Sequence, residues 1–405
     1  MAAGITLLLA GMALGFADLS RIGVLLVSLA LLAGLSSRRG SPELTVSRTV
    51  HPARLTVDQV ATVEVEFANT SRRRTPMLMA EERVDYALGD RPRFVLPRMG
   101  PGERREVTYD IRSHVRGRHR LGPLSLRVRD PFGLATVALA LSGTCEVLVL
   151  PRVEPLTGGR PGGEGIGAEG VIPHMVALHG EDDVSIREYR DGDDLRRIHW
   201  PATAHQGELM VRQEDRPAKR RAVVVLDTRT VGHGGSGRSS SLEWCVTTAA
   251  SVTAHVVDAG YAVHLLTADG RADNGVHHDE SLPDALESLA RVGLGAEDGL
   301  RAVLHAANAL TSQGGLVVYV GGPVGDEDAR TLAALRQPGS AGAAMVVDPE
   351  AFAGRTKRAA TAANRTEASL AILQSSGWMT TPVDARTTPA LAWAAVVGGQ
   401  VVGAR

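Results

Sequence analysis

A charge-dense segment between Ile186 and Glu214 holds the side chains best suited to chemistry. Five arginines lie there among acidic residues, so forked Arg–carboxylate pairs could neutralise most of the charge locally. Tyr189 and Trp200 lie in the same segment although only 3% of the chain is aromatic, which predicts a packed structure. The segment is therefore either a docking or catalytic surface or a structural staple held together by ion pairs.

The local pattern predicts four short elements in this segment: a strand at 186–189, a turn at Asp191-Gly192, a helix from Asp193 or Asp194 to Trp200 that breaks at Pro201, and a strand at 209–213. Asp193 would cap the helix, and Asp194 would favour the positive end of its dipole.

Two histidines in the segment, His199 and His205, could form a metal or acid–base pair. Their spacing, with Pro201 between them, does not place both on one helical face, so we expect His199 to be a partly buried, hydrogen-bonded residue. The alternative is a metal-dependent hydrolase in which the acidic residues Asp191, Asp193 and Asp194 act with His199. The sequence contains no nucleophile elbow and no HExxH motif, and the serines at 239–241 lack an adjacent base.

The composition excludes several classes of function. A formal net charge of -1 argues against a nucleic-acid partner. The two cysteines, Cys145 and Cys245, have neither zinc-site spacing nor a second pair for a disulfide framework. At 405 residues with 44% hydrophobic content, the chain can form two or three domains.

The first 40 residues predict a membrane hairpin with two short helices, at about 2–17 and 22–36. Both apolar runs are short for a hydrocarbon core, but glycine and alanine faces let two helices pack closely. Arg38 and Arg39 follow the second run, which places the rest of the chain and the N-terminus in the cytoplasm. A cleaved signal peptide is the competing interpretation. We therefore expect a multi-pass protein of the cell (inner or plasma) membrane.

Residues 43–151 alternate like short strands separated by turns, which predicts an all-β immunoglobulin-like sandwich of six to eight strands. Turn signals include Gly122-Pro123, and a turn after Asp130 would aim Phe132 into the core. The exposed run Arg72–Arg74 predicts a hairpin tip that either contacts anionic lipid or is simply solvated.

Residues 152–184 are rich in Gly, Pro and Glu and predict a linker ahead of the segment at 185–215. From 219 to 405 strands and helices alternate, which predicts an α/β doubly wound fold with a mostly parallel sheet. The expected strands are 222–226, 262–266, 316–320, 343–347 and 378–383, and the expected helices are 242–258, 282–292, 300–310, 326–336, 366–375 and 389–397.

Ligands of doubly wound sheets bind beyond the carboxyl ends of the strands, so the loop after Leu226 is the place to look. Asp227 stands where a von Willebrand factor A domain begins its metal site, but Arg229 and Val231 occupy the alternate positions and cannot ligate Mg2+. We expect a degraded metal site in which Asp227 pairs with Arg229 or caps backbone amides. The GxGxxG letters at 232–237 lie too far from the strand for a dinucleotide, which favours a mobile loop without a cofactor.

The letters RDGDDLRRIHW and GELMVRQ, with RGRHRLGPL and DPFGL upstream, resemble the signature of the bacterial domain-of-unknown-function 58 family. The family usually has a basic residue at the position of Pro201 and often an arginine at His205, so no role is carried over to either. The matching signature positions, taken as candidate partner-binding residues, are Arg187, Glu188, Tyr189, Asp191, Gly192, Asp193, Asp194, Arg196, Arg197, His199 and Trp200.

The resemblance implies a membrane-anchored protein with a von Willebrand factor A-like domain and a MoxR-type AAA+ ATPase as partner. It attaches no reaction and no cofactor. We therefore expect a non-enzymatic scaffold or adaptor in the assembly or quality control of envelope-linked complexes. The alternatives are the hydrolase described above and a purely structural membrane protein.

Overall fold

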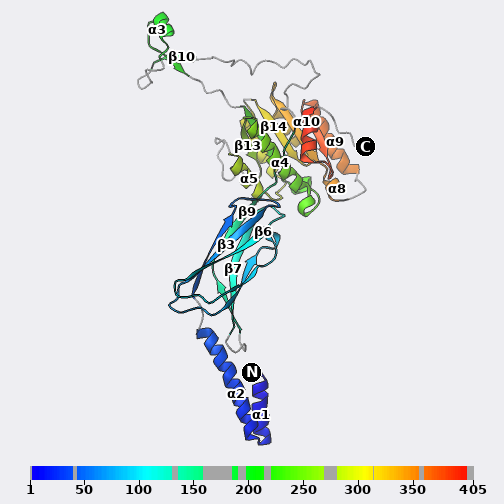
Figure 1. Cartoon of the computed structure of the whole chain (residues 1–405). Coiled ribbons are helices and arrows are strands. Elements are labelled where there is room, and N and C mark those ends of the chain that lie inside the picture. The colour runs from blue at the N-terminus through cyan, green and yellow to red at the C-terminus, as the bar shows by residue number, and fades with distance from the viewer. Residues whose placement is uncertain are drawn as a thin grey trace. The chain divides into compact units, whose positions relative to one another are not determined.

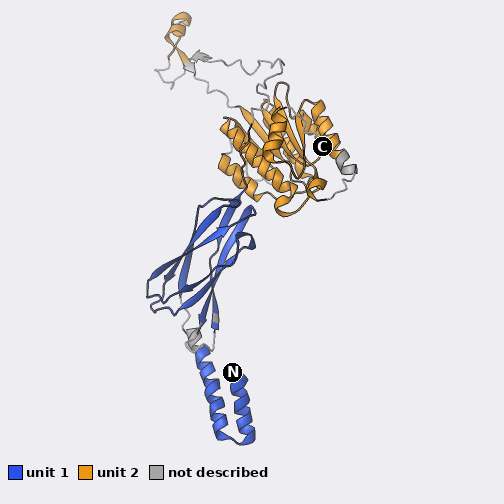
Figure 2. Cartoon of the chain, turned by 45° about the vertical axis from the view of Figure 1, so that its right-hand side comes forward, with its two compact units in different colours: residues 1–151 blue, residues 152–405 orange. Residues whose placement is uncertain are grey.

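The computed structural model describes residues 2–39, 43–129, 136–157, 185–189, 198–213, 220–268, 281–312, 314–354 and 360–398. The chain divides into two compact units, Met1–Pro151 and Arg152–Arg405 (Figure 2). Each unit is described by itself.

Unit 1 begins with two helices, α1 (Ala2–Leu14) and α2 (Ala17–Arg39). They pack so closely that a methyl group on Gly11 would meet the Ser20 backbone at 2.6 Å, and one on Gly23 would meet the Leu8 backbone at 2.5 Å. The glycine faces expected from the sequence therefore form the seam between the helices. Among the described helices, α2 is the one long and apolar enough to cross a membrane.

The second helix begins earlier than the sequence predicts. The charged residues Asp18 and Arg21, expected to lie between the helices, belong to the first turn of α2. Asp18 favours the positive end of the helix dipole, and Arg21 forms an ion pair with it at 3.0 Å. Both charges are therefore compatible with helix, and the connection shortens accordingly.

The rest of unit 1 is rich in β-structure and contains two sheets. The first is antiparallel, in the order β1 (Leu44–His51), β3 (Val60–Asn69), β6 (Arg104–Arg112). The second runs in the order β2 (Leu55–Thr56), β9 (Cys145–Leu150), β7 (Gly117–Arg129), β4 (Leu78–Val84), β5 (Arg93–Leu96), and β8 (Thr136–Leu141) also pairs with β7. A short 3-10 helix, η1 (Tyr86–Leu88), follows β4. Alternate residues of β3 and β4 are buried, and they form a shared core.

Two local predictions for this region are wrong. Arg72–Arg74 joins β3 to β4, which belong to different sheets, so the exposed run is an inter-sheet connection and not a hairpin tip. Gly122-Pro123 lies inside β7 and does not end the strand. Gly122 takes a positive φ of 90° and lies close to the backbone of Gly143, which only a glycine allows. Phe132 lies outside the described residues.

Unit 2 is built on a five-stranded parallel sheet (Figure 1). Its order is β13 (Ala262–Leu266), β12 (Arg221–Leu226), β14 (Leu316–Gly321), β15 (Ala341–Val347), β16 (Met379–Val383). One face packs against α4 (Ser241–Asp258), α5 (Leu282–Arg291) and α10 (Pro389–Gly398), and the other against α6 (Gly299–Thr311), α7 (Asp326–Ala334) and α9 (Ala360–Ser375). The predicted parallel α/β domain is confirmed.

Three short helical elements, η4 (Thr230–Gly232), η5 (Gly237–Ser239) and α8 (Pro349–Phe352), lie in the connections of unit 2. The predicted linker begins with ordered packing, because Leu156 lies in the core beneath α4 and the Glu154 amide donates to the Ser251 hydroxyl at 2.8 Å. Residues 158–184 lie outside the described part of the chain.

Candidate functional site

The strand order creates one preferred position for a ligand. The first strand, β12, is followed in the chain by β13 on one side, while the next strand, β14, lies on its other side. Ligands of such sheets bind where the chain leaves the first strand in opposite directions, beyond the carboxyl ends. Asp227 follows β12 directly and Gly322 follows β14 directly, so both lie at this position.

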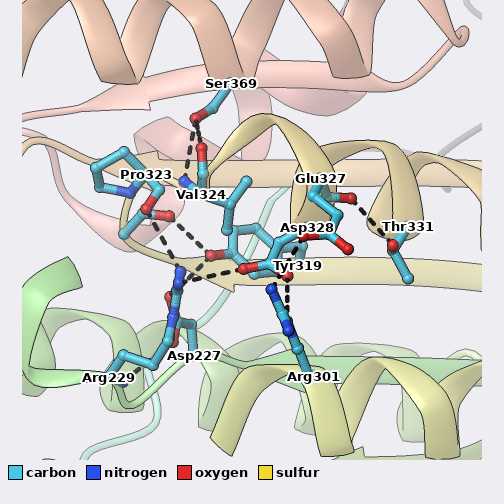
Figure 3. Close-up of polar contacts among 11 residues, drawn as sticks. Asp227, Arg229, Arg301, Tyr319, Pro323, Val324, Glu327, Asp328, Thr331 and Ser369 are labelled. Atoms are coloured by element: carbon cyan, nitrogen blue, oxygen red, sulfur yellow. Dashed lines mark hydrogen bonds and ion pairs between the residues drawn. The ribbon is translucent and has the colours of Figure 1, made fainter. Parts of the chain in front are cut away.

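The carboxylate of Asp227 is fully engaged there by groups of the same chain (Figure 3). Its Oδ1 accepts from the Arg229 amide at 3.0 Å and from Arg229 Nε at 2.9 Å. Its Oδ2 accepts from Arg229 Nη2 at 2.8 Å and from the Tyr319 hydroxyl at 3.0 Å. The pairing of Asp227 with Arg229 that the sequence predicts is therefore present, and it is bidentate.

Arg229 places a permanent positive charge beside Asp227. Its side chain is 8% exposed, and that of Asp227 is fully buried. Burial by itself lowers the pKa of Arg229, but the hydrogen bonds and negative charge of Asp227 outweigh it and raise the pKa above its usual value. The guanidinium therefore stays protonated beside the Asp227 carboxylate.

Tyr319 comes from β14 and closes the far side of the pair. Its hydroxyl lies 3.0 Å from Asp227 Oδ2 and 2.7 Å from the Gly322 carbonyl oxygen, so its single proton is shared between these two acceptors. Burial raises the pKa of Tyr319 well above its usual value, with the charge of Asp227 adding to the effect, so the hydroxyl remains a donor. Tyr319 and Asp227 are far apart in the chain, so residue spacing alone does not predict this contact.

A second network, missed in the sequence, supports the backbone of Asp227. His233 Nε2 lies 2.8 Å from the Asp227 carbonyl oxygen and must donate to it, so Nδ1 of the neutral ring accepts from the Ser241 hydroxyl at 3.0 Å. The Gly234 amide donates to the same Ser241 oxygen at 2.9 Å. Burial lowers the pKa of His233, which favours this neutral form.

The prediction that the serine run lacks an adjacent base is therefore wrong for Ser241. Its side chain lies against a histidine, but the residue is fully buried at the start of α4. A nucleophile must reach its substrate, so we assign the Ser241–His233 contact a structural role. The neighbouring Ser240 caps α4, because its hydroxyl accepts from the Glu243 amide.

The glycine-rich loop is packed where the sequence favours a mobile loop. A methyl group on Gly234 would meet the Pro349 carbonyl oxygen at 1.9 Å, and one on Gly235 would meet that of Phe352 at 2.7 Å. A methyl group on Gly322 would meet the Gly232 carbonyl oxygen at 2.2 Å. The glycines thus allow close contact between these loops.

Charged side chains extend the network from the buried pair towards the surface. Asp328 lies 3.7 Å from Arg229 and 3.4 Å from Arg301, and Arg301 also contacts Glu327 at 3.0 Å (Figure 3). Arg301 and Glu327 are largely exposed, so their pair adds little stability. Arg301 and Glu327 lie at the carboxyl edge of the sheet, so the surface there carries charges of both signs.

We call residues 185–215 the signature segment. The structure describes part of it: β10 (Ser185–Glu188), α3 (Trp200–Gln206) and β11 (Met210–Gln213). The strands pair antiparallel, with Arg187 opposite Val211 and Glu188 opposite Met210. The candidate residues Asp191, Gly192, Asp193, Asp194, Arg196 and Arg197 lie outside the described residues, as do Arg190 and the predicted caps of the helix.

The predicted end of the helix is in fact its beginning. α3 starts at Trp200, with Pro201 in the first turn, and Ile198 forms a β-bridge with Val211 just before it. Proline suits this position because the first amides of a helix have no internal partner. His199 is the N-cap, and its Nδ1 accepts from the Ala202 amide at 3.2 Å. His199 is therefore half-buried and hydrogen-bonded, as expected.

Trp200 is exposed, although an aromatic residue in so charged a segment predicts packing. Its side chain is 65% exposed within this chain, whereas Tyr189 is half-buried. A large exposed ring beside a charged segment is typical of a surface that meets another molecule. Among the described residues, no group of three or more His, Cys, Asp or Glu side chains could hold a metal ion.

No curated relative matches the chain. Solved structures resemble parts of it. A CARDB domain from Pyrococcus furiosus, in complex with di-metal ions, is 21% identical over 27% of this chain and 89% of its own, with a TM-score of 0.21. The ApaA protein from Bordetella pertussis is 15% identical over 27% and 94%, also with a TM-score of 0.21. An alkylpurine DNA glycosylase from Pseudomonas fluorescens is 15% identical over 33% and 38%, with a TM-score of 0.19. Similarity this low supports no assignment.

A family model gives the firmer result. Residues 185–353 match the family described as "Protein of unknown function DUF58". The match begins in β10, covers α3 and β11, and continues through the buried Asp227–Arg229 pair to α8. Residues 185–353 are therefore similar to the domain-of-unknown-function 58 family, as the signature residues at the start of this range indicate.

Proposed function

We propose that this protein is a non-enzymatic, membrane-anchored scaffold or adaptor whose domains bind protein partners. One observation carries the proposal: at the edge where the fold directs ligands, both oxygens of Asp227 are bound by Arg229 and Tyr319. A guanidinium fixed by the chain leaves neither oxygen free to coordinate a cation. The exposed surface around Asp227 and Arg229 is then the part of the domain that is left to bind a protein partner.

The proposal includes finer assignments for the two folds. An immunoglobulin-like sandwich for residues 43–151 is supported by two sheets around one core. A von Willebrand factor A-like fold for residues 219–405 is supported by the parallel sheet, the helices on both faces and the acidic residue at the tip of the first strand. In this view Arg229 replaces the metal ion of the related domains.

The proposal also includes a hairpin that crosses the membrane twice and leaves the bulk of the chain in the cytoplasm. The large side chains of α1 and α2 are exposed on most sides, including Leu9, Met12, Leu25 and Leu32, which suits contact with lipid. At 1.5 Å per residue α2 is about 34 Å long and α1 about 20 Å, so the bilayer must thin or α1 must be flanked by headgroups.

The proposed partner is a MoxR-type AAA+ ATPase, in the assembly or quality control of envelope-linked complexes. The family match and the exposed Trp200 support a docking role for the signature segment. We expect Arg196 and Arg197 to orient the ATPase on the signature segment, since charged side chains steer the association of two proteins.

Co-purification of the full chain from membranes tests the proposal. We expect the wild type to retain an ATPase and the variant Arg196→Ala/Arg197→Ala to lose it. The control is Arg104→Ala/Arg105→Ala, which removes two adjacent arginines that are at least 46% exposed from β6. A wild type that retains no ATPase contradicts the adaptor role. Stoichiometric divalent metal in the purified protein would instead support the hydrolase.

A further inference from the structure

The α/β domain exposes two apolar side chains on neighbouring loops at its carboxyl edge. Between residues 219 and 398, the large hydrophobic residues exposed in the described structure are Val231, Leu294 and Leu391. Val231 is 50% exposed and follows β12, and Leu294 is 55% exposed and precedes α6. Single exposed hydrophobics are ordinary, but two at the position where this fold directs ligands need an explanation.

The backbone holds the two loops together. Arg229 forms a β-bridge with Gly295, whose amide donates to the Thr228 carbonyl oxygen at 2.7 Å. The Thr230 amide and hydroxyl both donate to the Gly295 carbonyl oxygen, at 3.2 and 3.1 Å. Val231 and Leu294 are each next to a residue in this set of bonds. Their side chains are therefore carried by one rigid pair of loops and not by free segments.

The same edge is rimmed mainly by carboxylates. Glu297 and Asp298 follow Leu294 and are exposed, and the first turn of α7 contributes Asp326, Glu327 and Asp328. Arg301 offsets part of this charge through Glu327 and Asp328, and Arg229 is committed to Asp227. The described rim therefore has an excess of negative charge around an apolar centre.

We infer that the Val231–Leu294 edge docks a partner segment that presents an apolar side chain flanked by lysine or arginine. The apolar side chain covers Val231 and Leu294, and the flanking basic residues face the carboxylate rim. This inference rests on the proposed adaptor function and names the chemistry of the segment that the α/β domain recognises. A negatively charged rim also disfavours anionic lipid as the occupant.

A peptide array probed with the full chain in detergent tests the chemistry. The peptides place one Leu, Phe or Trp between Lys/Arg pairs, between Glu pairs or between Ser pairs. We expect binding to the Lys/Arg set, a loss of about tenfold in the variant Val231→Ser/Leu294→Ser, and a smaller, salt-dependent loss in Glu297→Gln/Asp298→Asn. The matched control Leu391→Ser removes a side chain that is 58% exposed on α10 and is expected to bind like the wild type.

Three outcomes overturn the inference. The first is that the Glu-flanked peptides bind as well as the Lys/Arg-flanked peptides. The second is that Val231→Ser/Leu294→Ser and the control Leu391→Ser lose the same amount of peptide binding. The third is that the wild type is a dimer and Val231→Ser/Leu294→Ser is a monomer, which would assign the edge to a second copy of the chain. Tryptophan fluorescence melts check that the variants remain folded.

The membrane pull-down separates this inference from the proposed function. If the Val231→Ser/Leu294→Ser variant keeps the ATPase that the wild type retains, the docking edge is wrong and the adaptor role stands. If the wild type retains no partner while the array shows the expected preference, the adaptor role is wrong and the edge still recognises basic-apolar segments.

Discussion

Among the described residues, two arginine–carboxylate pairs have both side chains buried, one in each unit. Arg48 of β1 lies 3.0 Å from Glu82 of β4, and the two side chains are 3% and 0% exposed. This pair connects the two sheets of unit 1, whereas Arg229 and Asp227 lie at the ligand-facing edge of unit 2. The chemistry is similar, so location decides the interpretation: the first pair is a clamp between two sheets, and we propose that the second fills a binding position.

The surroundings of the two carboxylates also differ. Among the described residues, the side-chain hydrogen bonds to Glu82 come from Arg48 alone. Burial raises the pKa of Glu82 and the charge of Arg48 opposes the rise. Asp227 receives a backbone amide and the Tyr319 hydroxyl in addition to its arginine. Loss of the arginine should therefore cost unit 1 more than unit 2.

The largest effect is expected for Arg48→Met. Removing the arginine leaves Glu82 buried without a partner, which should cost about 3–5 kcal/mol of unfolding free energy. Adding Glu82→Met should recover most of the loss. All four tryptophans lie after residue 199, so unit 1 is best followed by pulse proteolysis of the full chain in urea. Arg104→Met, at a 73% exposed pair, is the control, and equal losses in both variants contradict the clamp.

A smaller loss is expected for Arg229→Ser, about 1–3 kcal/mol, because Asp227 keeps the Tyr319 hydroxyl and a backbone amide. The freed oxygens should now accept a cation, so millimolar MgCl2 should raise the melting temperature of the variant and leave the wild type unchanged. Tryptophan fluorescence follows unit 2 directly. Magnesium stabilisation of the wild type would show that Arg229 does not fill the cation position, and would remove the distinction between the two pairs.

His233 should make the stability of unit 2 depend on pH. Burial lowers its pKa below the ordinary 6.5 in the folded state. Between the lowered value and 6.5 the unfolded chain binds more protons, so stability is complete above 6.5 and falls as the pH drops, by at most about 1.4 kcal/mol per pH unit. His233→Gln should flatten this slope in tryptophan fluorescence melts. An unchanged slope would mean that another group titrates.

The smallest effect is expected for Tyr319→Phe, which removes one hydroxyl and keeps the ring in the core. The variant should lose about 1 kcal/mol, since Asp227 Oδ2 keeps Arg229 while the Gly322 carbonyl oxygen loses a donor. Chemical denaturation followed by tryptophan fluorescence measures it. A loss as large as that of Arg229→Ser would make Tyr319 an equal member of the pair.

The elements of unit 2 could be predicted closely because their local patterns agree with the fold. Buried strands such as Val223–Leu226 read as continuous apolar runs, and Ser240 with Glu243 marks the start of α4. α3 was misplaced because Pro201 was read as a helix end. Proline permits a helix start equally well, and the β-bridge at Ile198 decides between the two.

The site was predicted only where the chain itself brings residues together. Asp227 and Arg229 are two residues apart, so their pairing followed from spacing. His233, Ser241 and Tyr319 meet through the path of a loop that depends on close contacts at Gly234 and Gly322. The clamp left a detectable signal: Arg48 and Glu82 are each a single charge at inward positions of otherwise apolar strand faces.

The arginine at the tip of β12 has one further consequence. A bound ion can be withdrawn by a chelator or diluted away, but a guanidinium attached to the backbone cannot leave. Recognition at this edge should therefore persist in EDTA and be indifferent to swings in cellular magnesium.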